Sequence, residues 1–335
     1  MKSLQLHKCD VKNIKPEISE ALIEELEGVL TNIDNLSKEN VEAVIRFQDN
    51  DGGFRPFIGR WIYDSDAYKR VANYTSFLCI CILINADMNE VADVNSKVFD
   101  LAFNYVERHG MAGHGYDAEI DEVRNLSLFL NNGLKEFFKK HSPEHKSFEA
   151  YVTSLVNKYR DMLASGNTTV GFGADIRKDI EKMLDVFDHT YYIAYGSNLN
   201  KEQMERRCPG SKSVERLLLK NYRLDFNLYL TISCDANFNT PVVIWKISED
   251  NERNLDGYEG VARGIYRKEY IRLFVSGAYR YCLLYIMNDI PNRRNVLPSE
   301  TYVKTCMIGY DNFGFIKEYL EDALYRAKHN YSGEQ

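Results

Sequence analysis

The chain has 335 residues, a length that suits two domains better than one compact core. Hydrophobic residues make up 44% and charged residues 27% of the chain, which is typical of globular proteins and excludes a fibrous or disordered chain. The net charge of −7 argues against a nucleic-acid binder, because such proteins usually carry a basic face.

The cysteines and the hydropathy pattern indicate where the protein resides. The seven cysteines are an odd number without the paired spacing of a disulfide framework. The first 17 residues lack the apolar core of a secretory signal, and the longest apolar run, residues 77–84, is far below the roughly 18 residues of a membrane span. We therefore expect a cytoplasmic protein that does not associate with membranes.

Residues 15–187 show the apolar spacing of amphipathic helices. Ile18, Leu22 and Leu26 recur at four-residue spacing after Pro16, and Ser37 is a candidate N-cap for the helix that follows it. Further helical stripes cover residues 68–86, 91–109, 121–140, 146–164 and 174–187. The pattern predicts an all-α domain over residues 1–187, and no motif assigns a role to it.

Two segments of this helical half are candidate functional motifs. The stretch "QDNDGGF", residues 48–54, is similar to turns of α/α toroids, but a glycine turn packed with aromatic side chains is the favoured interpretation. Several residues of metal-ligating type also gather here, namely His109, His114, Asp117, Glu119, Asp121, His141 and His145. No H-E-x-x-H pattern is present, so solvated loops are favoured and no metal site is predicted.

The pattern changes near residue 190. Segments rich in Tyr, Val and Ile alternate in the manner of strands, at 191–196, 214–232, 240–247, 264–275 and 279–287. Helix-like segments interrupt them at 201–207, 250–258, 299–307 and 314–328. The second domain, residues 188–335, is therefore predicted to be α+β.

The stretch "TYYIAYGSNLNKEQMERRCPG", residues 190–210, predicts a strand, a tight turn and a helix. Gly196 permits close approach of a ligand to the backbone or a positive φ, and Ser197 and Asn198 are candidate helix caps or ligand donors. Such a turn leaves backbone N–H groups without intrahelical partners, and these favour a carboxylate or a similar anion. An ordinary capped turn is the alternative interpretation.

A second segment, "LDGYEGVARGIYRKEYI", places Glu259 between a short helix and a new strand. Burial at such a junction would raise the pKa of the carboxyl toward the range of a general acid or base at neutral pH. The alternative is an exposed glutamate that ends a helix.

Together with "PSETYVKTCMIGYDNFGFIKEYLEDAL", these two segments resemble the γ-glutamylcyclotransferase-like superfamily, which includes the AIG2-like proteins. The three motifs stand in the family's order over residues 190–328. The resemblance implies a small mixed β-barrel flanked by helices. It also implies that Tyr195, Gly196, Ser197, Asn198 and Leu199 cradle the α-carboxylate end of a γ-glutamyl group.

The same resemblance implies the catalytic group and the substrate. Glu259 matches the family's catalytic glutamate, and Tyr266 and Tyr302 match two tyrosines of the substrate site. The α-amine of a γ-glutamyl amide would attack its own γ-carbonyl and release 5-oxoproline, with Glu259 as base and then acid. This chemistry needs neither a metal nor a cofactor, so none is expected.

The partner implied is a small-molecule or peptide γ-glutamyl substrate, and Asn198 resembles the branch of the family that acts on γ-glutamyl amino acids or amines. The alternative hypothesis is a non-catalytic protein that recognises a γ-glutamyl or amino-acid ligand, with the helical domain as a peptide-recognition module. Burial of Glu259 beside the 195–199 loop would favour the enzyme, whereas exposure or pairing with an arginine would favour the binding protein.

Overall fold

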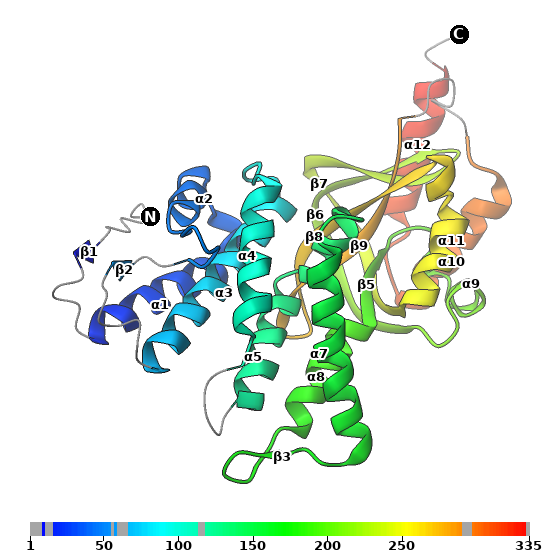
Figure 1. Ribbon diagram of the computed structural model, residues 1–335. Coiled ribbons are helices and arrows are strands. Elements are labelled where there is room, and N and C mark those ends of the chain that lie inside the picture. The colour runs from blue at the N-terminus through cyan, green and yellow to red at the C-terminus, as the bar shows by residue number, and fades with distance from the viewer. Residues whose placement is uncertain are drawn as a thin grey trace. The chain divides into compact units, whose positions relative to one another are not determined.

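The computed structural model describes residues 9–10, 16–54, 57–58, 66–112, 118–289 and 297–332 (Figure 1). The chain divides into two compact units, Met1–Phe187 and Asp188–Gln335. The prediction of a helical N-terminal region and a C-terminal sheet domain is confirmed.

The N-terminal unit is built from helices. They are α1 (Pro16–Thr31), η2 (Ile33–Asn35), α2 (Lys38–Ile45), α3 (Asp66–Met88), α4 (Ser96–His109), α5 (Ala118–Asn131), α6 (Leu134–Lys140), α7 (Lys146–Ser165) and α8 (Arg177–Asp188). Two pairs of two-residue strands accompany them, β1 (Cys9–Asp10) with β2 (Phe57–Ile58) and β3 (Thr169–Val170) with β4 (Ala174–Asp175). Residues 77–84 of α3 are fully buried, as their continuous apolar run requires.

Local sequence signals set several helix ends. Ser37 caps α2, because its Oγ accepts a hydrogen bond from the Asn40 N–H at 3.3 Å. The single stripe predicted over residues 121–140 is divided into α5 and α6. The division falls at Gly133, whose φ of +86° is a conformation that glycine adopts without a steric penalty.

The glycine turn at residues 48–54 is closely packed. The Gln48 side-chain amide donates to the Gly52 carbonyl at 3.3 Å and to the Val98 carbonyl in α4 at 2.8 Å. A Cβ on Gly53 would lie 2.7 Å from the Tyr105 ring, so the backbone rests directly on an aromatic side chain. This arrangement agrees with the favoured interpretation of a glycine turn packed with aromatic side chains.

The C-terminal unit contains a five-stranded mixed sheet with the order β6-β7-β5-β9-β8. Its strands are β5 (His189–Ala194), β6 (Lys212–Asn227), β7 (Tyr229–Ser248), β8 (Tyr266–Val275) and β9 (Ala278–Met287). β5 is central, antiparallel to β7 and parallel to β9. Buried on both faces except at its first residue, β5 ends in the middle of the domain's hydrophobic core.

The closed barrel implied by the family resemblance is not observed in the described residues. The sheet is open, with β6 and β8 at its edges. Side-chain hydrogen bonds, instead of a strand ladder, join the tip of the β6–β7 hairpin to the opposite strands. The Tyr266 hydroxyl donates to the Leu230 carbonyl at 2.6 Å, and the Thr231 hydroxyl accepts from the Met287 N–H at 3.1 Å.

The sequence pattern also misplaced one turn. Residues 214–232 read as a continuous strand, but the chain reverses between β6 and β7 at Leu228. Leu228 has a φ of +63°, a conformation usually taken by glycine or asparagine, and no glycine marks the turn. Residues 212–227 and 229–248 therefore form one long hairpin, which the hydrophobic pattern did not indicate.

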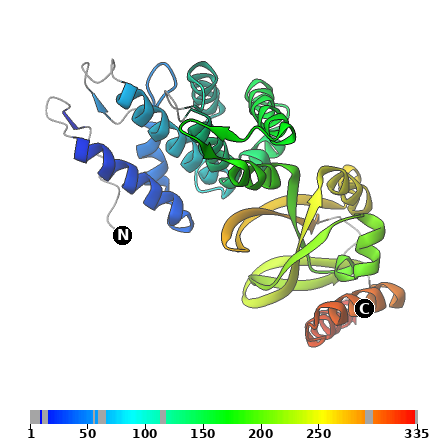
Figure 2. The same cartoon turned by 90° about the horizontal axis from the view of Figure 1, so that it is seen from below.

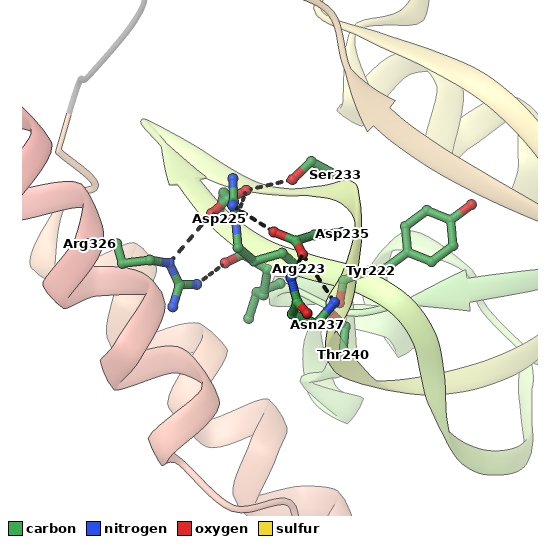
Figure 3. Close-up of polar contacts among 9 residues, drawn as sticks. Tyr222, Arg223, Asp225, Ser233, Asp235, Asn237, Thr240 and Arg326 are labelled. Carbon is green, nitrogen blue, oxygen red and sulfur yellow. Dashed lines mark hydrogen bonds and ion pairs between the residues drawn. The ribbon is translucent and has the colours of Figure 1, made fainter.

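In the described residues six helical segments accompany the sheet: η4 (Ser197–Leu199), α9 (Lys201–Arg207), α10 (Glu249–Glu259), η5 (Val261–Arg263), α11 (Glu300–Phe313) and α12 (Glu318–Ser332). Figure 2 shows α12, in red, beside the β6–β7 hairpin, in light green. Arg326 of α12 donates to the Leu224 carbonyl at 2.6 Å and pairs with Asp225 at 3.8 Å (Figure 3). Asp225 also accepts hydrogen bonds from Arg223 and from the Ser233 hydroxyl at 2.8 Å, so one carboxylate links both strands of the hairpin to the helix.

None of the helices in the described part of the chain combines the length and the apolar character needed to cross a bilayer.

Candidate active site

The candidate site forms where the central strand of the C-terminal sheet ends. After Ala194 the chain passes through Tyr195 and Gly196 into the single 3-10 turn η4, Ser197–Leu199. Because β5 lies between two other strands, its end brings this loop against the buried centre of the domain.

The turn uses only part of its own hydrogen-bonding capacity. The Leu199 N–H donates to the Gly196 carbonyl at 2.9 Å, and the Asn200 N–H donates to the Ser197 carbonyl at 3.0 Å. Among the described residues, the N–H groups of Gly196, Ser197 and Asn198 donate no hydrogen bond. These three consecutive donors are therefore available to a ligand, as the sequence pattern suggested.

The cap of α9 is not the one that the sequence pattern suggested. Asn200, instead of Ser197 or Asn198, caps this helix, since its Oδ1 accepts from the Gln203 N–H at 3.1 Å. The 3-10 turn inserts three residues between the strand and the helix and so moves the cap position to Asn200. The side chain of Asn198 is therefore able to form other hydrogen bonds.

The Asn198 side-chain amide lies at the centre of a buried hydrogen-bond network. Its Nδ2 donates to the Tyr192 hydroxyl at 2.8 Å and to Glu259 Oε1 at 3.0 Å. Its Oδ1 accepts from Arg207 Nη1 at 2.8 Å and from Gln203 Nε2 at 3.3 Å. All of the amide's usual hydrogen-bonding positions are therefore occupied.

Glu259 is the last residue of α10, and Gly260 ends the helix with a φ of +65°. Burial raises the pKa of the Glu259 carboxyl from 4.5 to about 7, against the opposing effects of the nearby Arg207 charge and the Asn198 hydrogen bond. A carboxyl with this pKa exchanges a proton readily at neutral pH, which is the property required of a general base that later acts as an acid.

Three tyrosines predicted for the site are anchored to backbone groups nearby. The Tyr195 hydroxyl donates to the Tyr285 carbonyl and the Tyr266 hydroxyl donates to the Leu230 carbonyl, both at 2.6 Å. The Tyr302 hydroxyl instead accepts from the Leu230 N–H at 3.1 Å. Of these three phenols, Tyr302 alone receives a hydrogen bond from the backbone, and its hydroxyl also lies within hydrogen-bonding reach of the Cys306 thiol.

The charge of the Glu259 carboxyl acts on four nearby phenols. Burial raises the pKa values of Tyr192, Tyr195, Tyr266 and Tyr302, and a negative charge on Glu259 raises each of them further. The tyrosines consequently remain protonated over the whole physiological range. Glu259 is the group among them that titrates near neutrality.

Close packing holds the loop in place. Gly196 has a φ of −120°, so a positive φ does not explain this glycine. A Cβ there would make ordinary van der Waals contacts, 3.5 Å from the Tyr302 hydroxyl and 3.4 Å from Leu230, so close packing does not require this glycine either. On the other side Leu199 is buried against Gly309 of α11, where a Cβ would come within 2.6 Å of the Leu199 Cβ.

Comparison with known proteins matches this domain to one family. The sequence model of the AIG2-like family matches residues 241–322. The predicted resemblance is confirmed. The γ-glutamylcyclotransferases of Mus musculus and Homo sapiens are each 28% identical over 156 residues, covering 43% of this chain and 81% of the relative. A solved structure named γ-glutamyl cyclotransferase is 26% identical, covers 41% of this chain and 86% of that chain, and has a TM-score of 0.36.

The C-terminal domain brings Asn198 into contact with Glu259 and places Tyr195, Tyr266 and Tyr302 near that carboxyl, but the sequence analysis missed some of their partners. Tyr192, Gln203 and Arg207 contact Asn198 directly, and Gly309 admits the loop against α11. Gln203 and Arg207 stand four residues apart in a helix-like segment, so their shared helix face was a usable signal.

The metal-ligand candidates of the helical half have other partners. His141 Nε2 lies 2.8 Å from Asp87, and His145 Nδ1 lies 3.0 Å from Asp100. His114 and Asp117 lie outside the described residues. In the part of the chain that is described, no three His, Cys, Asp or Glu side chains are grouped to hold a metal ion.

Proposed function

We propose that the C-terminal domain is a γ-glutamyl cyclotransferase that releases 5-oxoproline from a γ-glutamyl amide. The observation that carries the proposal is the Glu259 carboxyl, whose pKa is raised to about 7 while Asn198 holds it at 3.0 Å beside the turn. Similarity to relatives named γ-glutamylcyclotransferase supports this type of activity.

The proposed substrate binds with its α-carboxylate on the turn. The N–H groups of Gly196, Ser197 and Asn198 donate no hydrogen bond within the described residues, and consecutive N–H donors suit a carboxylate. Anchoring that end of the γ-glutamyl group would fold the chain so that its α-amine approaches its own γ-carbonyl. Orientation of this kind lowers the barrier of an intramolecular reaction by several kcal/mol or more.

The proton balance needs a single carboxylate. Glu259 takes a proton from the α-ammonium group, and the neutral amine attacks the γ-carbonyl carbon to form the five-membered lactam. The ring nitrogen of the resulting tetrahedral intermediate still carries two hydrogens. Glu259 gives the first proton to the leaving nitrogen as the bond to the leaving amine breaks, then takes the second proton from the ring nitrogen and passes it to the departing amine, which leaves as an ammonium ion. No water and no enzyme nucleophile is consumed, so Glu259 ends the cycle in its starting state.

Tyr302 is the proposed donor to the developing oxyanion. Its hydroxyl accepts from the Leu230 N–H and has the Cys306 thiol, a weak acceptor, within reach of its proton, whereas the protons of Tyr195 and Tyr266 are donated to backbone carbonyls. The hydroxyl also lies 3.5 Å from the position of a Cβ on Gly196, at the turn where the substrate would bind.

The test is the release of 5-oxoproline, measured by mass spectrometry on the full chain. The panel holds γ-glutamyl amino acids, γ-glutamyl-ε-lysine, γ-glutamyl alkylamines and glutathione. We expect release by the wild type and a loss of at least about 100-fold in Glu259→Gln, which keeps the shape of the side chain but cannot take the proton. Glu249→Gln is the matched control, because Glu249 is an exposed residue in the first turn of the same helix.

Two results would overturn the proposal. One is release at an unchanged rate by Glu259→Gln. The other is silence of the wild type over the whole panel while γ-glutamyl compounds still raise its melting temperature, which would support the non-catalytic binding protein.

A further inference from the structure

Two side chains of α9 fix the orientation of the Asn198 amide. Gln203 and Arg207 are four residues apart and both donate to Asn198 Oδ1, at 3.3 and 2.8 Å. Since Asn Oδ1 and Nδ2 are nearly equal in size, the hydrogen-bond partners decide which of them faces which neighbour. With the oxygen committed to α9, the nitrogen necessarily faces Tyr192 and Glu259.

The reversed orientation would be unfavourable on both sides. The Asn198 oxygen would then face the carboxylate of Glu259, and its NH₂ group would face the guanidinium of Arg207, so like polar groups would meet at both ends. Arg207 supplies the stronger restraint of the two α9 donors, because its hydrogen bond is shorter and carries a full charge.

Arg207 is itself held in place. Its guanidinium lies over the Tyr258 ring, 4.5 Å from the ring centroid, and Tyr258 directly precedes Glu259 in the chain. Stacking on an aromatic ring and bonding to an amide oxygen restrict a side chain that would otherwise be flexible. The cation is therefore fixed beside the carboxyl on which the proposed reaction depends.

Arg207 is the cation among the described groups that act on Glu259. Several other groups near Glu259 can titrate or carry charge. Arg263 of η5 (Val261–Arg263) lies against Gly260. The others are Cys208 after α9, Tyr192 and Tyr195 of β5 and its loop, Tyr266 of β8 and Tyr302 of α11. The phenols and the thiol stay neutral at physiological pH, because burial raises the pKa of Cys208 to about 12 and those of the tyrosines above their usual value. The balance at Glu259 is thus one of burial against Arg207 and Asn198.

We propose that Arg207 is a positioning residue of the candidate site, which holds the Asn198 amide with its nitrogen toward Glu259 and places a fixed positive charge near that carboxyl. The proposal rests on the proposed function for its catalytic consequence. Its structural part, the coupling of Arg207 to Glu259, concerns the protein without substrate.

The chain offers a matched control for Arg207. Arg206 is the preceding residue in α9 and has the same charge, but it is exposed and pairs with Glu202 one turn earlier at 3.0 Å. Arg207→Met and Arg206→Met remove the same charge from the same helix, so a difference between them reports the specific position of Arg207. Arg207→Lys keeps the charge and removes the planar guanidinium.

The first measurement is a titration of Glu259 by NMR of the side-chain carboxyl carbons in full-length protein labelled with ¹³C-glutamate. The Glu259 signal is assigned by its absence in Glu259→Gln. In Arg207→Met we expect the titration midpoint to rise by about 1 pH unit or more, because an opposite charge near a carboxyl shifts its pKa by about 1–3 units. Arg206→Met should leave the midpoint unchanged, and Arg207→Lys should restore part of the shift.

The second measurement is the pH profile of 5-oxoproline release. In Arg207→Met the rise of kcat/KM with pH should move to higher pH by the same amount as the NMR midpoint, whereas a purely structural loss would lower the profile without moving it. An unmoved Glu259 midpoint in a folded Arg207→Met and Arg207→Lys would overturn the inference. If the wild type releases no 5-oxoproline but the midpoint moves, the proposed function fails while the positioning of Glu259 by Arg207 stands.

Discussion

At the scale of single residues, the decisive property of this protein is one half-buried carboxyl, Glu259, with two favourable neighbours, Asn198 and Arg207. Burial alone would hold Glu259 neutral, and the Asn198 hydrogen bond and the Arg207 charge bring its pKa back to about 7. The residue types at 198, 207 and 259 are all visible in the sequence. Their proximity is not, because the three residues stand up to 61 positions apart along the chain.

The raised pKa of Glu259 makes the stability of the protein depend on pH. The folded state binds the Glu259 proton more tightly than the unfolded state does, so the contribution is fully present below pH 4.5 and is lost as the pH rises through about 7. A difference of about 2.5 pKa units corresponds to about 3 kcal/mol. We expect Glu259→Gln to gain about this much in unfolding free energy relative to the wild type between pH 4 and pH 8.

Denaturant unfolding of both proteins over this pH range measures the effect. Glu249→Gln, an exposed change in the same helix, should follow the wild type at every pH. A constant difference between Glu259→Gln and the wild type would mean that Glu259 has an ordinary pKa in the folded protein.

At the scale of elements, the site depends on how closely α11 approaches the loop. Gly309 lies in the middle of α11, where alanine would normally be the better helix former by about 1 kcal/mol. A Cβ at this position would lie 2.6 Å from the Leu199 Cβ and 2.8 Å from the Asn200 N, so the helix and the loop would have to separate. Gly309 thus lowers the helix propensity of α11 but allows the helix to contact the turn.

We therefore expect Gly309→Ala to destabilise the protein by about 2 kcal/mol and to reduce 5-oxoproline release, because Asn198 would move away from Glu259. Gly257→Ala in α10 is the contrasting change, since nothing lies within 4 Å of a Cβ there, and it should stabilise by about 0.5–1 kcal/mol. Thermal unfolding and activity of both variants test the difference. Equal stabilisation by the two changes would contradict the close contact.

At the scale of the whole molecule, the chain contains two units, each with a buried core of its own. The core of the C-terminal unit consists of residues from Tyr191 to Ala327, and the N-terminal unit buries a separate set that includes Leu26, Phe77 and Phe129. Units with separate cores can unfold in separate steps. We expect calorimetry of the full chain to resolve two transitions.

A substitution in the glycine turn at residues 48–54 shows which calorimetric transition belongs to the helical unit. Gly52 has a φ of +94°, and a Cβ on it would lie 1.9 Å from the Leu101 carbonyl oxygen. Gly52→Ala should cost about 3 kcal/mol and lower one transition only, whereas Gly28→Ala, which meets nothing within 4 Å in α1, should not lower either. Loss of both transitions in Gly52→Ala would show that the two units unfold together.

Local patterns predicted most of the helices and strands and nominated the turn at 195–199 and Glu259. Hydrophobic spacing, a serine cap at Ser37 and the strand–turn–helix pattern at 190–210 act over a few residues, so they can be read along the chain. The reversal at Leu228 could not be read in this way, because the residue that adopts the positive φ is a leucine and no glycine follows Asn227.

The contacts that position the residues of the candidate site depend on three-dimensional packing. The hydrogen bond from Arg207 to Asn198 and the packing of Leu199 against Gly309 join residues from different elements. The cap at Asn200 and the open edges of the sheet likewise follow from the folded chain. The proton affinity of Glu259 belongs with them, because it is set by burial and by charges from other elements instead of by its neighbours in the chain. Residue types and local geometry follow from the sequence itself, whereas distances, burial and pKa values exist only after distant segments have packed together.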